Sequence, residues 1–301
     1  MWASLRDTFL VGQFEVLRAI RTWRAVALGV LYLVATSGGT WMFTRLILAF
    51  ENQMARTLGV PTTDRPGTMM DTLLEMEDFR TLLGAMLGDP ALVDVALSTP
   101  LLAIFHLWFG LLLLPFLSTT TAAECISVDM RNRAVRFELL RTGRLELVFG
   151  RLGGQAVLTA FASALGAVAA FVVAWFAMVL TDPIDLALAM ANATAKAWTF
   201  GLPFLGVGVA CSQLTVSPAW ARVLAVAATG GSWVAYGVTN WAKSEGFVPV
   251  VLDSLLTIFP QTWIRGLWEP GLQWVVSSSV FFALALAVTA LGFIRMSRRD
   301  V

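Results

Sequence analysis

The side chains that could carry out chemistry are few in this chain of 301 residues. His106 is the single histidine, which excludes metal motifs built on a histidine pair, such as HExxH. Cys125 and Cys211 are the two cysteines, and their spacing matches no metal or redox motif. Both lysines, Lys196 and Lys243, follow an alanine, so the chain has no phosphate-binding GxxxxGKS or GxxxxGKT loop. We therefore expect no catalytic residue, no metal site and no cofactor in this chain.

The composition is that of a membrane protein, with 57% hydrophobic residues and a mean hydropathy of +0.75. A helix needs about 20 apolar residues to cross ~30 Å of hydrocarbon, whereas a barrel would show short alternating strands. Six runs of at least 20 residues are free of charged side chains: 25–44, 95–123, 152–181, 197–221, 223–242 and 270–294. We expect one all-α, polytopic domain over residues 1–301 with six transmembrane helices. The net charge of +1 gives no indication of nucleic acid binding.

The positive charges set the expected orientation of these spans. With the N terminus in the cytosol, fourteen of the 21 Lys and Arg residues fall on the cytosolic side and six on the other side. Cytosolic loops of membrane proteins are enriched in these residues. We therefore expect both termini to lie in the cytosol.

The first 22 residues have the pattern of an amphipathic helix. One arc of the helical wheel is apolar and the opposite arc is polar, which is typical of a helix lying in the membrane interface. The apolar arc holds Trp2, Leu5, Phe9, Val16, Ile20 and Trp23, and the polar arc holds Ser4, Asp7, Glu15, Arg18 and Arg21. A cytosolic lead-in to the first span is the alternative.

Two longer segments are expected outside the membrane. Residues 51–94 carry eight acids against three arginines, and an apolar stripe within them predicts a helix packed on the outer ends of the spans, or alternatively a lid that gates substrate. Residues 243–269 alternate between short apolar and polar stretches and contain tryptophans. Neither stretch can span, so a pair of short interfacial or re-entrant helices is expected there.

The connector between the second and third spans, residues 124–151, is longer than a turn requires. Six arginines alternate with four acids, and Phe137 and four leucines lie between them. Such a mixture of apolar and charged side chains is typical of an element that docks on another protein, with apolar anchors inside a polar rim. The alternative is a solvated, positively charged cytosolic face.

The same connector resembles that of the permease subunit of ATP-binding cassette (ABC) exporters of the type-2 class. Glu124 resembles the family's opening acid, Glu138-Leu139-Leu140 its central Glu-Leu-Leu, and Arg144-Leu145-Glu146 its closing Arg-x-Glu. Gly150-Arg151 matches the Gly-Lys at the start of the third span, with arginine for lysine. The order of an interfacial helix, six spans and a cytosolic coupling connector extends the resemblance over the whole chain.

The resemblance implies a function and partners. It implies the transmembrane subunit of an ABC transporter, an exporter in a bacterial inner membrane. This transmembrane subunit would work with a separate cytosolic subunit that binds ATP and Mg. It would also pair with a second transmembrane subunit to form a homodimer. The residues expected to dock on the ATPase are Glu124, Arg131, Arg133, Arg136, Phe137, Glu138, Leu139, Leu140, Arg141 and Arg144. The residues expected near a substrate path along spans two and five are His106, Trp108, Thr229, Ser232, Tyr236 and Asn240.

A path lined by such apolar and aromatic groups suits a lipid-like, peptide or hydrophobic drug-like cargo better than a small ion.

Two other classes of function stay open. A non-transporting membrane module could use the same ATPase to act on an extracytoplasmic partner through residues 51–94. A secondary transporter or channel is less favoured, because the six apolar runs contain no carboxylate that could bind a coupling ion. His106 alone also fits a hydrogen-bonded packing residue.

Overall fold

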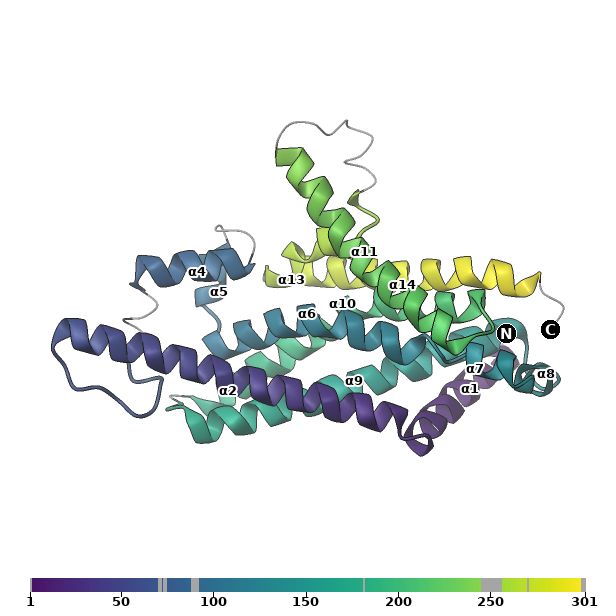
Figure 1. The fold of residues 1–301 in the computed structure, drawn as a ribbon, viewed down its shortest axis with the longest axis horizontal. Coiled ribbons are helices and arrows are strands. Elements are labelled where there is room, and N and C mark those ends of the chain that lie inside the picture. The colour runs from purple at the N-terminus through teal and green to yellow at the C-terminus, as the bar shows by residue number, and fades with distance from the viewer. Residues whose placement is uncertain are drawn as a thin grey trace.

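The computed structural model describes residues 2–69, 72, 75–87, 92–180, 182–244, 256–269 and 271–298, and every regular element in these ranges is a helix. The long helices lie side by side, and both termini lie at the same end as the connector (Figure 1). In chain order the helices are α1 (Trp2–Arg21), α2 (Arg24–Leu58), α4 (Glu77–Leu87), α5 (Val93–Leu97), α6 (Leu101–Ala122), α7 (Ser127–Arg131), α8 (Ala134–Leu139), α9 (Arg144–Ala177), α10 (Pro183–Leu214), α11 (Pro218–Ser244), η2 (Pro260–Trp263), α13 (Arg265–Trp268) and α14 (Gln273–Ser297).

Five helices among the described residues are long and apolar enough to cross a membrane, and they correspond to the predicted spans one, two, three, four and six. The chain is therefore an all-α polytopic membrane protein. The predicted fifth span, 223–242, lies within α11, a single helix of 27 residues. Helix α11 is not among the five helices that meet both the length and the hydropathy expected of a span. It leans away from the bundle toward the end opposite the connector (Figure 1).

Several helices extend beyond the charge-free runs that predicted the spans. Helix α10 begins at Pro183, ahead of residue 197, because the Asp182 side chain accepts hydrogen bonds from the backbone of Ile184 and Asp185, both at 3.0 Å, and so caps the helix. It ends at Leu214, before residue 221. Helix α2 likewise continues to Leu58, well past residue 44. Charged residues are tolerated within these helices, so charge-free runs underestimate helix length.

Helices α6 and α10 form the centre of the bundle. In the most apolar stretch of each helix, 72% of the residues of α6 and 78% of those of α10 are buried. The corresponding share is 22% to 28% for α2, α9 and α14. Phe200 of α10 is fully buried and packs edge-on against Phe204 and against Phe281 of α14, with ring centroids 5.3 and 5.4 Å apart. The other three helices leave apolar faces exposed, as a lipid-facing surface requires.

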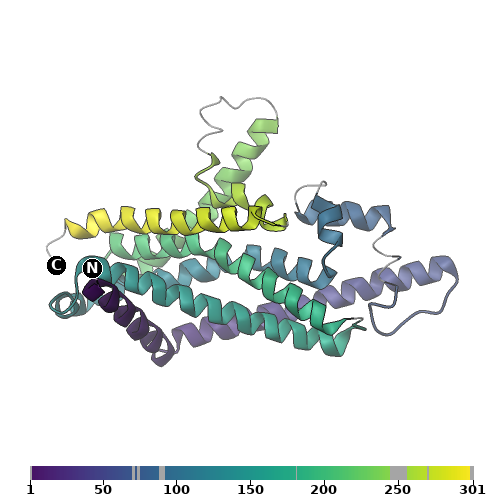
Figure 2. The ribbon, with the colours of Figure 1, turned by 180° about the vertical axis from the view of Figure 1, so that it is seen from behind.

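Helix α1 packs closely on the start of α9, in agreement with a helical segment at residues 1–22 (Figure 2). Glycines make this contact possible, since a Cβ at Gly150 would lie 2.6 Å from the Thr8 carbonyl oxygen and one at Gly154 would lie 2.8 Å from that of Gly12. Trp23, with a φ of 60°, turns the chain from α1 into α2. Leu5, Phe9 and Ile20 of the apolar arc of α1 are exposed, with Phe9 at 66%, which is the face an interfacial helix presents to lipid.

The two segments expected outside the membrane are partly described. Within 51–94, Glu51 is fully buried at the end of α2 and accepts backbone hydrogen bonds from Gly67 and Met69, at 2.9 and 3.2 Å. Helix α4 carries part of the predicted apolar stripe and buries Phe79 and Leu83. Within 243–269, residues 245–255 lie outside the described residues, and the remainder includes the short helices η2 and α13.

Replacing Gly154 by valine should detach α1 from α9, because its side chain would overlap the Gly12 carbonyl and the Glu15 side chain. Overpacking of this kind lowers the free energy of unfolding by about 1–3 kcal/mol. We expect faster proteolysis of residues 1–22 in the purified protein and a lower unfolding temperature. Gly153→Val is the matched control, since a Cβ there meets nothing within 4 Å. Equal behaviour of the two variants would contradict the packing role of Gly154.

Candidate functional site

The connector is held against the bundle by its inward-facing residues. The backbone amides of Ile126 and Ser127 both donate to the Ser212 hydroxyl of α10, at 2.8 and 2.9 Å. Val135 of α8 is fully buried, and Leu139 packs against the same apolar cluster. Helices α7 and α8 are short, so these tertiary contacts fix their position more than their intrinsic helicity does.

A buried ion network lies behind the connector, centred on Arg151 in the second turn of α9. Its side chain is only 3% exposed and pairs with Asp129 of α7 and, at 2.5 Å, with Glu138 of α8. Glu15 of α1 lies 3.8 Å away. A buried guanidinium is stable only when carboxylates compensate its lost hydration. Arg151 therefore ties α1, both connector helices and α9 into one unit.

Helix α1 contributes a second set of polar contacts to this network. Arg18 pairs with Asp129 at 2.5 Å, and Glu15 accepts a hydrogen bond of 2.7 Å from the Gln155 amide. The Ser4 hydroxyl donates to Glu146 at 2.6 Å. Glu15 and Arg18 of the polar arc predicted for residues 1–22 therefore contact α9 and α7, whereas Ser4 and Arg21 remain exposed. Sequence reasoning missed the roles of Glu15, Arg18 and Gln155, and the shared helical arc of the first two was the available signal.

The outward face of the connector combines exposed apolar and basic side chains. Phe137 is 72% exposed and Leu140 82% exposed. They lie beside four exposed arginines, and we call this set the connector face: Arg131, Arg133, Arg136, Phe137, Leu140 and Arg141. Six of the ten residues predicted to dock on a partner are thus exposed within residues 131–141.

The other four predicted docking residues serve the fold. Glu138 binds Arg151, Leu139 packs on the bundle, and Glu124 pairs with Arg222 of α11. Arg144 is half-buried and donates to the Met296 and Ser297 carbonyl oxygens, at 3.3 and 2.7 Å. It therefore satisfies the C-terminal end of α14, whose last carbonyls have no partner within the helix.

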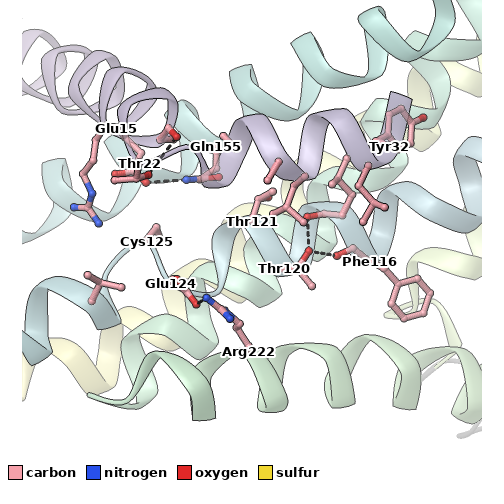
Figure 3. Close-up of a pocket in the computed structure, with 18 of the residues that line it drawn as sticks. Glu15, Thr22, Tyr32, Phe116, Thr120, Thr121, Glu124, Cys125, Gln155 and Arg222 are labelled. Carbon is pink, nitrogen blue, oxygen red and sulfur yellow. Dashed lines mark hydrogen bonds and ion pairs between the residues drawn. The ribbon is translucent and has the colours of Figure 1, made fainter. Parts of the chain in front are cut away.

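A cavity of about 690 Å³ opens between the α1–α2 junction, α6 and α11. Glu15, Gln155 and Cys125 lie toward one end, Tyr32 and Phe116 lie toward the other, and the Glu124–Arg222 pair forms part of the wall (Figure 3). Its volume is in the range of sites for small ligands.

The six residues predicted to line a substrate path are not part of this cavity. His106 is buried and its Nε2 lies 3.1 Å from the Thr194 hydroxyl of α10, while Thr229 is buried and bonded to Thr119 at 2.8 Å. Ser232 accepts a hydrogen bond from Gln261, at 3.0 Å. The remaining three are half-buried or exposed: Trp108, Tyr236 and Asn240. The structure does not bring these six side chains together in a single chain.

Among the described residues, no group of three or more His, Cys, Asp or Glu side chains could hold a metal ion. Comparison of the chain with protein-family models gives no match, and comparison with curated proteins gives no significant one.

Replacing Arg151 by methionine should destabilise the protein strongly, because Glu15 and Asp129 would remain buried without their main cation. Breaking a buried pair in this way costs about 3–5 kcal/mol. We expect a clear drop in unfolding temperature in mild detergent. Arg80→Met removes an exposed pair with Asp94 and should cost below about 1 kcal/mol. A loss no larger than that of the control would refute the central role of Arg151.

Proposed function

We propose that this chain is the transmembrane subunit of an ABC transporter, an exporter in a bacterial inner membrane that is driven by a separate cytosolic ATPase. The main support for this proposal is the composition of the connector face. Phe137 and Leu140 expose 72% and 82% of their surface between exposed arginines, where a partner protein could cover them. Apolar anchors inside a rim of arginines are the composition of a protein interface.

The charge of the connector face favours an acidic groove as its partner. Arg131, Arg133, Arg136 and Arg141 are exposed, whereas the nearby acids Asp129 and Glu138 point inward to Arg151. The face is therefore basic although the connector as a whole contains acids. Such separation of charge steers association with a partner of opposite potential.

The ion network supports transmission of force from the connector into the membrane. An ATPase that moves α7 and α8 would move Asp129 and Glu138, and through Arg151 the cytosolic ends of α9 and α1. Packed cores and buried ion pairs transmit displacements because they do not deform continuously. Two such subunits, each docked on one ATPase, would alternate between inward-open and outward-open arrangements.

Reversing two charges on the connector face should uncouple the ATPase. The Arg136→Glu, Arg141→Glu double variant places like charges opposite the acidic groove, which costs several kcal/mol. We expect a loss of stimulated ATPase activity of at least tenfold, with normal membrane insertion. Arg295→Glu, Arg298→Glu is the control at the same end of the molecule. Normal stimulation in the connector variant would contradict docking at this face.

Removing the apolar anchors should weaken the complex without altering its charge. Phe137→Ala with Leu140→Ala removes two side chains that make few contacts in this chain, so its unfolding temperature should stay unchanged. Central anchors of an interface contribute about 2 kcal/mol or more each. We expect at least tenfold weaker binding of the ATPase in a pull-down titration. Unchanged affinity would place the docking surface elsewhere.

A further inference from the structure

The cavity between the α1–α2 junction, α6 and α11 has two chemically different ends. Its apolar part is lined mainly by Leu28, Leu31, Leu113, Phe116 and Leu117. Thr120 and Thr121 also lie there, but their hydroxyls are used in hydrogen bonds to the carbonyls of Phe116 and Ser118, at 2.7 and 2.9 Å. This part of the wall therefore offers contacts to an alkyl chain and few to a polar group.

The polar end is rich in acceptors. Glu15 and Gln155 both line the cavity and are at most 5% exposed. The Gln155 amide nitrogen already donates to Glu15, whereas the Gln155 carbonyl oxygen is buried and receives no hydrogen bond from any described residue. An unsatisfied buried acceptor costs free energy, so a ligand that donates a hydrogen bond there would be favoured.

The charges behind this end favour a cation. The network that Glu15 joins contains three carboxylates and two guanidiniums, so it carries one net negative charge when all five groups are ionised: Glu15, Asp129, Glu138, Arg18 and Arg151. Both arginines that line the cavity already pair with acids, Arg18 with Asp129 and Arg222 with Glu124. Little positive charge in the lining is therefore left uncompensated to attract an anion.

We propose that this cavity binds a single-chain amphiphile with an ammonium head group. The head would donate to the Gln155 oxygen and the Glu15 carboxylate, and the alkyl chain would lie along α2 and α6. Leu31 and Phe116 line the cavity and remain 63% and 37% exposed, so it opens on a surface of two membrane-spanning helices. The ligand would reach the site from the lipid. As the cargo of a transporter this ligand rests on the proposed function above, whereas the binding site itself does not.

The test uses photolabelling of the full chain reconstituted in lipid nanodiscs, without any ATPase. The probe is a dodecylamine that carries a diazirine near the chain end, and the reference is the matching carboxylate. We expect the amine to label residues around Leu31 and Leu117, with competition by unlabelled dodecylamine. Glu15→Gln should lower this labelling at least tenfold, the effect of losing a charge-assisted hydrogen bond.

Because Glu15 belongs to the ion network, a second pair of variants tests the cavity at positions outside that network. Leu31→Trp would fill the rim of the cavity from an exposed position and should abolish labelling, whereas Val34→Trp, 60% exposed on the same helix and outside the lining, should leave it unchanged. Equal labelling by the carboxylate, or labelling that survives Leu31→Trp, would overturn the proposal. Crosslinks to a second copy at these positions would also overturn it, since the surface would then be a subunit contact. Because no ATPase is present, none of these failures bears on docking at the connector face.

Discussion

The pairing of the buried Arg151 guanidinium with carboxylates is the interaction on which the connector end of the molecule depends. The guanidinium has little contact with water, and carboxylates from α1, α7 and α8 compensate it. In a poorly hydrated site such pairs are strong, and an unpaired member is costly. The three elements that supply the carboxylates must therefore stay in place together. Short helices such as α7 and α8 would not hold a fixed position by their own propensity.

This arrangement divides the connector into two functions. Asp129, Glu138 and Val135 face the bundle, and as a result the arginines and apolar side chains of the connector face are turned outward. Because Asp129 and Glu138 pair with the buried Arg151, the exposed side of the connector is left with its arginines and is basic. In the function that we propose, this surface, fixed to the ends of α1 and α9, recognises the ATPase and passes its movement to the membrane-spanning helices.

The sequence predicted the helices well where hydrophobicity decides the outcome. Long apolar runs can only be helices in a bilayer, and five of the six predicted spans correspond to such helices. Boundaries were less predictable, because an aspartate cap starts α10 at Pro183 and Lys196 lies within it. The runs also could not reveal that α11 leans away from the bundle (Figure 1).

The site was predictable only in part, since helical periodicity tells which residues share a face but not what that face contacts. Glu15 and Gln155 are 140 positions apart, and their hydrogen bond follows from the packing of α1 on glycines of α9. Arg144 lies in the same arginine-rich run as the exposed arginines, yet its guanidinium donates to carbonyl oxygens at the end of α14. Charged neighbours alone could not tell the exposed Phe137 and Leu140 from Leu139, which packs on the bundle.

The most direct measurement of docking is site-specific crosslinking from the connector face in cells. A photoreactive amino acid at Leu140 should crosslink the chain to one P-loop ATPase, whereas the same group at Ile184, exposed near the opposite end of the bundle, should not. A crosslink to lipid or to no protein at Leu140, together with solute transport by the purified chain alone, would contradict the account and indicate an autonomous transporter.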